Sequence, residues 1–163
     1  MDKYLLRDLW RKTIQGGGGH CPVCNRWGKI NVVIVNELQA LSLLWMSRAT
    51  TEENGYINMQ TTPPRFVLKS RSYHHLAKWN LIEKHQKSDD KTEKSDAFWR
   101  VTEKGILFLN NQLQIPNKVF CYNKEIEGWG DQLIYFKDCF GKHFNYEEVI
   151  NHTFNLNAIK IKD

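Results

Sequence analysis

The chain has 163 residues, of which 41% are hydrophobic and 25% are charged, so it can bury one substantial core and at most a small second one. Its longest apolar stretches, residues 32–35 and 41–46, are far too short to span a bilayer, and the first ten residues lack the apolar run of a secretory signal. We therefore expect a cytoplasmic protein that has no membrane contact and keeps its four cysteines reduced.

Residues 1–35 are predicted to form an N-terminal helix followed by a cysteine knuckle. Residues 2–14 place Leu6, Leu9, Trp10 and Ile14 on one helical face. The four glycines at 16–19 indicate a flexible break; they do not form a phosphate loop, because no Gly-Lys-Ser/Thr follows.

Two cysteines with two residues between them, Cys21 and Cys24, are the strongest chemical signal in the chain. This spacing lets two thiolates converge on a tetrahedral zinc ion, and the segment resembles the first half of a zinc ribbon. The second half of a ribbon is missing from the sequence, and His20 is too close to Cys21 for easy ligation. The open interpretations are a structural zinc site, plain reduced thiols in a turn, and a redox pair, which would need a helix N-terminus at Cys21.

Residues 36–115 contain, in order, the elements of a winged helix-turn-helix. Residues 36–49 predict an almost entirely apolar core helix with a capping box formed by Asn36 and Gln39. A strand at 55–60, a helix started by Pro63 at 63–68 and a second helix that ends in the segment 76–85 follow. After them come a polar loop at 86–97 and a strand at 98–102, in the overall order strand, helix, helix, strand, wing, strand, helix. Thr102 is expected to cap a closing helix whose buried stripe is Ile106, Leu109 and Leu113.

The positive charge is concentrated in two segments. Residues 1–36 carry a net charge of +4, and residues 54–82 carry four basic and no acidic residues. In the second helix, Tyr73, Leu76, Ala77 and Asn80 fall on one face, which we expect to pack, and basic residues fall on the other. The residues predicted to contact nucleic acid are Arg65, Lys69, Ser70, Arg71, His74, His75 and Lys78.

Within that set, Arg71 is the best candidate for a bidentate contact to guanine, whereas Lys69 and Lys78 are better suited to phosphate. The loop at 86–97 carries three lysines and four acids, so it is not the basic wing that reads a minor groove. His74 and His75 are interpreted as exposed polar residues rather than metal ligands.

The segments Leu76-Ala-Lys-Trp-Asn-Leu-Ile-Glu83 and Trp99-Arg-Val-Thr-Glu-Lys-Gly105 resemble the end of the recognition helix, the wing and the closing helix of MarR- and PadR-like winged-helix regulators. More loosely, the whole chain, with its early RDLWRK and CPVCNRWGK and its late YEEVI, resembles a family of small uncharacterised proteins encoded by tailed bacteriophages. The first resemblance implies a fold and covers about a third of the chain. The second implies a phage origin and no mechanism.

Residues 116–163 are expected to form a small β-rich extension, with strands at 118–122 and 133–140 separated by a turn at 128–131. Asn145 is expected to cap a short helix at 146–151, and an edge strand is expected at 154–158. The extension is compatible with a dimerisation element for a homodimer, a docking surface for a protein, or a cover for the body.

The sequence as a whole predicts an α+β, non-enzymatic DNA-binding protein, with double-stranded DNA as partner and a role in regulating gene expression. It contains no Ser/His/Asp spacing, Rossmann loop or Walker loop. The alternative is a protein that inhibits a host machine or defence system, using the winged helix as scaffold. Single-stranded nucleic acid or RNA binding through Trp27 or Trp129 is a third possibility.

Overall fold

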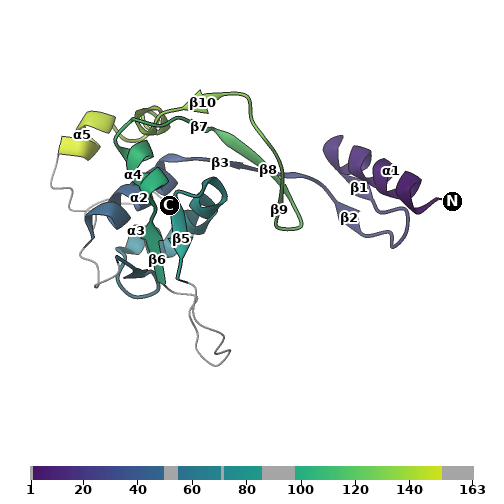
Figure 1. Ribbon diagram of the computed structural model, residues 1–163, viewed down its shortest axis with the longest axis horizontal. Helices are drawn as coiled ribbons and strands as arrows, with labels where there is room; N and C mark the ends of the chain where they lie inside the picture. The colour runs from purple at the N-terminus through teal and green to yellow at the C-terminus, as the bar shows by residue number, and fades with distance from the viewer. Residues whose placement is uncertain (1, 50–54, 71, 86–97, 152–163) are drawn as a thin grey trace. The chain divides into compact units, whose positions relative to one another are not determined.

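The computed structural model describes residues 2–49, 55–70, 72–85 and 98–151, and shows short helices combined with small antiparallel sheets (Figure 1). The expected α+β class is confirmed. The helices are α1 (Lys3–Gln15), α2 (Glu37–Arg48), α3 (Arg65–Ser70), the 3₁₀ helix η1 (Ser72–Trp79), α4 (Glu103–Leu109), the 3₁₀ helix η2 (Phe136–Cys139) and α5 (Tyr146–Asn151). The strands are β1 (Gly19–His20), β2 (Trp27–Gly28), β3 (Asn31–Ile34), β4 (Ile57–Asn58), β5 (Ile82–Lys84), β6 (Phe98–Val101), β7 (Ile115–Pro116), β8 (Lys118–Tyr122), β9 (Glu125–Trp129) and β10 (Leu133–Ile134). Among the described residues, every helix is too short or too polar to cross a lipid bilayer.

The chain divides into two compact units. Unit 1 consists of residues Met1–Ile34 and Lys118–Asp131, and unit 2 consists of Val35–Asn117 and Gln132–Asp163. The segment 116–163, expected to be a single extension, is therefore shared: β8 and β9 belong to unit 1, and β10, η2 and α5 belong to unit 2.

Unit 1 is a three-stranded antiparallel sheet of order β3-β8-β9, together with α1 and the β1–β2 hairpin. Asn123 and Lys124 connect β8 to β9, and both have positive φ (53° and 67°), as a tight two-residue hairpin turn requires. The sequence prediction put the turn at 128–131. That placement is wrong for Gly128 and Trp129, which lie in β9, because the asparagine-lysine pair already reverses the chain.

The predicted N-terminal helix is confirmed as α1, with the Asp2 carboxylate accepting the backbone N–H of Tyr4 at its start (3.1 Å). The Trp10 indole Nε1–H donates to the Tyr122 hydroxyl (3.2 Å) and so joins α1 to β8. A Cβ atom at Gly28 would lie 2.7 Å from the Trp10 ring, so this close approach depends on glycine.

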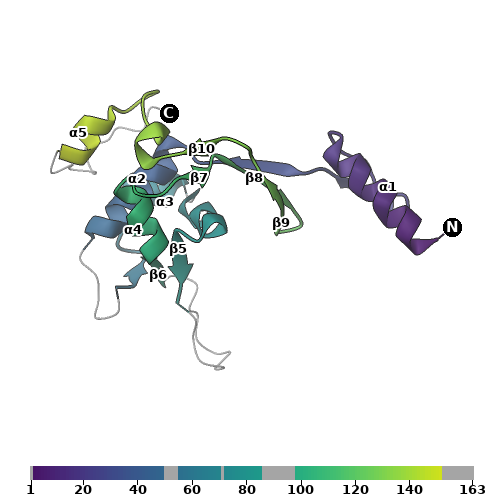
Figure 2. The ribbon, with the colours of Figure 1, turned by 45° about the horizontal axis from the view of Figure 1, so that its top comes forward.

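Helix α2 is the core of unit 2, as predicted, and it lies next to α3 and α4 in both views (Figure 1, Figure 2). The Asn36 side chain accepts the Gln39 backbone N–H (2.8 Å), and the Gln39 side chain accepts the Asn36 N–H (3.4 Å), which confirms the capping box. The helix is apolar nearly all round, so it is enclosed: its fully buried apolar side chains are Ala40, Leu41, Leu43, Leu44 and Met46.

Helix α3 begins at Arg65, two residues later than expected. The physical cause is the second proline, because a residue that precedes proline is driven out of helical geometry, and Pro63 precedes Pro64. The Pro64 carbonyl then accepts the N–H groups of Val67 (3.0 Å) and Leu68 (3.2 Å), which forms the first turn.

The expected second helix is a 3₁₀ helix, η1, and this changes which residues are buried. With three residues per turn, Tyr73, Leu76 and Trp79 form one row. Leu76 and Trp79 are fully buried, and the Tyr73 ring packs edge-on against Trp99 of β6 (6.1 Å between centroids). The expected burial of Asn80 is wrong: Asn80 is exposed and ends the helix with φ of 58°.

A three-stranded antiparallel sheet of order β4-β6-β5 completes this part of unit 2, with Ile57 opposite Trp99 and Ile82 opposite Val101. After β6, Thr102 caps α4 as predicted, and its hydroxyl accepts the Gly105 N–H (3.0 Å).

The predicted buried stripe of α4 is confirmed at Leu109 and wrong at Ile106, which is 43% exposed; Leu113 is half-buried but lies beyond the end of the helix. The helix buries Gly105 and Phe108 together with Leu109. A Cβ at position 105 would lie 2.3 Å from the Leu81 carbonyl oxygen. Because Gly105 has no side chain, α4 can approach Leu81 closely and bury the helix face that carries Gly105.

The remainder of unit 2 packs onto the start of α2 and the end of α4. The expected strand at 133–140 ends at Ile134, and η2 follows, with Phe136 fully buried against Phe108 (5.7 Å between centroids). The Asn145 side chain caps α5 as expected, accepting the Glu147 N–H (2.9 Å). The edge strand expected at 154–158 lies outside the described residues.

Candidate functional site

Helix α3 presents two of the predicted cationic residues. Arg65 and Lys69 are separated by four positions, so they lie on the same face of the helix, and both are exposed. They belong to the span 54–82, which contains no acidic residue. All the charged residues of this span, apart from its histidines, are therefore basic.

Helix η1 contributes three further predicted residues. His74 is exposed as expected, but the expected exposure of His75 is wrong, because His75 is half-buried. Lys78 is also half-buried and, at a spacing of three, shares one row of the 3₁₀ helix with His75. Nδ1 of His75 is buried and has no hydrogen-bond partner in the part of the chain that the structure describes. Burial, followed by the nearby charges of His74 and Lys78, lowers the pKa of His75.

The other two predicted residues are Ser70 and Arg71. Ser70 is the last residue of α3, and its side chain lies outside the described part of the structure. Arg71, the candidate for guanine contact, also lies outside it, as does the loop 86–97. The structure thus brings Arg65, Lys69, His74, His75 and Lys78 together on two consecutive helices and does not test Ser70 or Arg71.

The sheet beside these helices holds two cations that the sequence analysis did not single out. Arg100 forms an ion pair with Glu83, which stands opposite it in the β5–β6 register, and its guanidinium lies over the Tyr56 ring (4.6 Å to the centroid). The Lys84 ammonium lies over the Trp99 ring (5.9 Å). The opposite charges of Glu83 and Arg100 could have suggested a cross-strand ion pair from the sequence, but only if the register of the two strands had been known.

The Cys21–Cys24 pair lies in the turn that joins β1 to β2. The Cys21 N–H donates to the Arg26 carbonyl (2.8 Å), the Asn25 N–H donates to the Cys21 carbonyl (2.8 Å), and Asn25 has φ of 58°. The nearby backbone amide of Cys24, followed by that of Val23 and by the Cys24 side chain, lowers the pKa of Cys21. This turn therefore favours a thiolate at Cys21.

Within the described residues, no group of three or more His, Cys, Asp or Glu side chains is placed to hold a metal ion. The His20 Nδ1 lies 3.0 Å from the Asn25 carbonyl oxygen, and its ring packs against Trp27. The two thiols have the sequence spacing of a metal-binding knuckle, but they supply only half of a tetrahedral set. Zinc binding stays a prediction.

The other two cysteines lie apart from this turn. Cys121 is buried in β8, where a lone cysteine is usually a small buried hydrophobic residue. Cys139 lies at the end of η2, where burial, followed by the negative charges of Asp138 and Glu37, raises its pKa to about 12.

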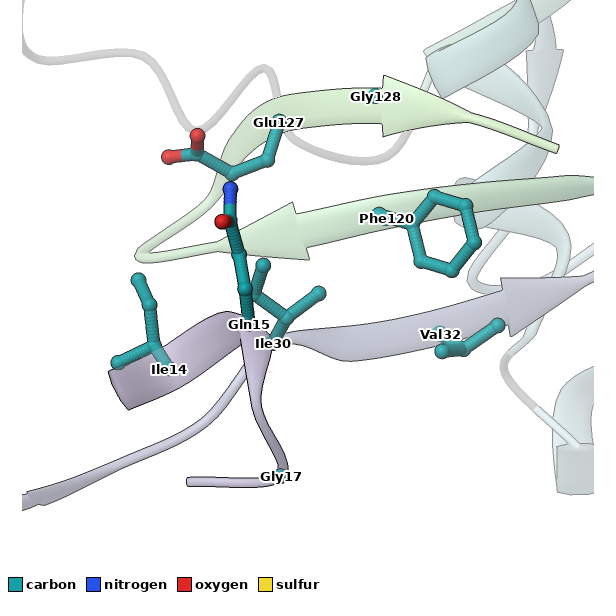
Figure 3. A pocket seen from close by; sticks show the side chains of 8 residues that line it. All are labelled: Ile14, Gln15, Gly17, Ile30, Val32, Phe120, Glu127 and Gly128. Carbon is teal, nitrogen blue, oxygen red and sulfur yellow. The ribbon is translucent and has the colours of Figure 1, made fainter. Parts of the chain in front are cut away.

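Unit 1 contains a partly open pocket of about 350 Å³ between α1 and the β3-β8-β9 sheet (Figure 3). Its lining is mainly apolar, with Gln15 and Glu127 as the polar side chains; the full set is Ile14, Gln15, Gly17, Ile30, Val32, Phe120, Glu127 and Gly128. Glu127 is the one titratable residue of the lining, and it is exposed, so the pocket lacks the paired groups of an acid–base site.

No protein-family model, curated protein sequence or solved structure matches this chain.

Proposed function

We propose that unit 2 is a winged helix-turn-helix that binds double-stranded DNA, in a non-enzymatic protein that regulates gene expression. The resemblance of the chain to tailed-bacteriophage proteins is the ground for inferring a phage origin. The order core helix, strand, two short helices and a two-strand return to a closing helix supports the fold assignment (α2, β4, α3, η1, β5, β6, α4).

The observation that carries the proposal is the exposed cationic face of α3, with Arg65 and Lys69, inside a span without acidic residues. Phosphate contacts by such residues release counterions from the duplex, which supplies sequence-independent affinity. The exposed His74 and half-buried Lys78 of η1 extend the same donor-rich segment. Arg71, between the two helices, is proposed to read guanine.

The test is fluorescence anisotropy of a labelled duplex of mixed sequence, titrated with the full chain at several salt concentrations. We expect binding to weaken steeply as salt rises, and each of Arg65→Ala, Lys69→Ala and Lys78→Ala to lower affinity and reduce the salt slope by about one unit. Lys104→Ala is the matched control, because Lys104 is exposed on α4 of the same unit. Folded protein that does not bind duplex at low salt would overturn the proposal.

The second candidate is binding to a host protein, with inhibition of a host machine or defence system as the outcome. The observation that favours it is the number of exposed apolar side chains in unit 1, including Val23 and Trp27. The two candidates differ in salt response, because an apolar protein interface weakens little as salt rises. Saturable, salt-insensitive binding to one purified host protein, without duplex binding, would favour this candidate.

A further inference from the structure

Unit 1 has too small a core for its size. It contains 48 residues in the segments 1–34 and 118–131, and its fully buried apolar side chains among the described residues are Ile14, Val119 and Cys121. Domains this small usually need a disulfide, a metal or a partner chain for stability. Nine large apolar side chains of the unit are exposed instead: Tyr4, Leu5, Leu9, Val23, Trp27, Val32, Ile34, Ile126 and Trp129.

The two cysteines of the β1–β2 turn can supply two of the four ligands of a tetrahedral zinc site. Cys24 is exposed and Cys21 is half-exposed, and both lie in a short turn that is closed by the Asn25 N–H donating to the Cys21 carbonyl (2.8 Å). His20 is the last residue of β1, directly before Cys21; its Nδ1 lies 3.0 Å from the Asn25 carbonyl oxygen, and its ring packs against Trp27. Among the described residues, no third His, Cys, Asp or Glu side chain of the same chain is placed with these two thiols to hold a metal ion.

We propose that Cys21 and Cys24 of two copies of this chain together hold one Zn²⁺ ion, forming a four-thiolate site that joins two chains through unit 1. Four sulfur ligands in tetrahedral geometry are a preferred environment for structural zinc. Each copy supplies two, and the pairing is closed because a two-fold axis relates identical half-sites. The proposal does not depend on DNA binding.

The exposed apolar and basic side chains of the hairpin suit a second copy of the chain as the binding partner. Val23 lies between the two cysteines and is 76% exposed, and Trp27, which is 58% exposed, follows them, so the metal is flanked by apolar groups that a partner would cover. Arg26 and Lys29 are exposed on the same hairpin. A zinc ion with four thiolates carries a net charge of −2, which these residues from two copies would offset.

Assembly requires no oxidant. Four thiols bind one Zn²⁺ and release four protons to solvent, two from each chain, and no bond is oxidised or reduced. The site should therefore form in reducing buffer, be lost as pH falls, and be reversed by a chelator.

The experiment uses the full chain, stripped of metal with chelator and reductant, and titrated with Zn²⁺ while light scattering measures mass. We expect monomer before addition, dimer afterwards, a saturation ratio of one zinc per two chains, and return to monomer with excess chelator. Titration with Co²⁺ should give the visible spectrum of a four-sulfur tetrahedral site, which reports ligand type independently of mass.

Cys21→Ser and Cys24→Ser should each abolish zinc-dependent dimerisation, while Cys139→Ser, in unit 2, should leave it unchanged. Circular dichroism shows whether each variant stays folded, and the Co²⁺ spectrum of the unaltered chain keeps the test decisive if a variant does not. One zinc per chain in a monomer, no zinc uptake, or a Co²⁺ spectrum of mixed sulfur and nitrogen ligands would each overturn the proposal.

Discussion

The carboxylate of Glu37, in the first turn of α2, accepts the backbone N–H of Phe144 (2.8 Å), a residue 107 positions later in the chain. The same carboxylate accepts the N–H of His143 through both oxygens (2.9 and 3.1 Å), and Glu37 is only 8% exposed. A buried charged side chain is tolerated here because it is hydrogen-bonded by backbone donors. This contact ties the loop before α5 to the core helix of unit 2.

Glu37→Gln should therefore destabilise unit 2. The amide keeps the shape but presents one acceptor oxygen and two donors to a site built from N–H groups, so we expect a loss of about 1–3 kcal/mol in the free energy of unfolding. Urea denaturation measures it. Glu125→Gln, an exposed residue of β9, is the control, and an equal loss in both variants would contradict the role given to Glu37.

Gly105→Ala should also be destabilising, because the added methyl group would sit 2.3 Å from the Leu81 carbonyl oxygen and 2.7 Å from a Val101 methyl carbon. The Leu81 carbonyl also accepts the Thr102 N–H (3.0 Å), so it cannot move without loss of that bond. We expect about 1–3 kcal/mol of destabilisation, measured by thermal or urea unfolding.

The matched control for Gly105 is Gly128→Ala, since a methyl group there meets its nearest neighbour, a Phe120 ring carbon, at an ordinary 3.9 Å. The control should change stability much less. If Gly105→Ala is as stable as the unaltered chain, α4 does not approach Leu81 as closely as described.

His75 should make the protein sensitive to mild acid. Its pKa is lowered in the fold from the ordinary value near 6.5, so below that pH the unfolded chain binds the proton more readily than the folded one. The stability is fully present above pH 6.5 and declines as pH falls through the folded pKa. Unfolding measured between pH 7 and 5 should show this decline.

His75→Gln should flatten that pH dependence, because the variant has no imidazole to protonate. His143→Gln, a change at an exposed histidine whose backbone alone contacts Glu37, should leave the dependence in place. An identical pH profile for His75→Gln and the unaltered chain would show that another group is responsible.

The cysteines should react with iodoacetamide in a defined order when metal is removed. The lowered pKa of Cys21 enlarges its thiolate fraction at pH 7.5, whereas a pKa of about 12 leaves Cys139 with a thiolate fraction on the order of one in ten thousand or less. Peptide mapping should find Cys21 alkylated well before Cys139. In strong denaturant this order should disappear, and native labelling of Cys139 as fast as Cys21 would disprove it.

Local signals in the sequence predicted much of unit 2. Capping by Asn36 and Thr102 and the apolar run of α2 depend on neighbours within four residues, and the structure confirms them. The prediction of which helix face is buried was less accurate. Asn80 was placed on the buried face because 3.6 residues per turn were assigned to a helix that is 3₁₀. Ile106 was placed on the buried face because the close approach of Leu81 to Gly105 cannot be seen in the sequence.

Long-range contacts account for the rest. The pairing of β3 with β8 and the Glu37–Phe144 contact join segments more than 80 residues apart, and no periodicity in the sequence encodes them. At the candidate site, basic residues and the cysteine pair were found from composition and spacing. The buried Nδ1 of His75 and the engagement of Arg100 with Glu83 required coordinates.

The antiparallel pairing of β3 with β8 has a consequence for synthesis on the ribosome. Residues 31–34 are synthesised early, but their partners at 118–121 are synthesised only after residues 35–117, which form most of unit 2. During this time the nascent N-terminal segment has an unpaired strand edge and exposed apolar side chains. The residues between the two strands can begin to fold before β3 has its partner. Premature termination before residue 118 would leave that edge permanently unpaired.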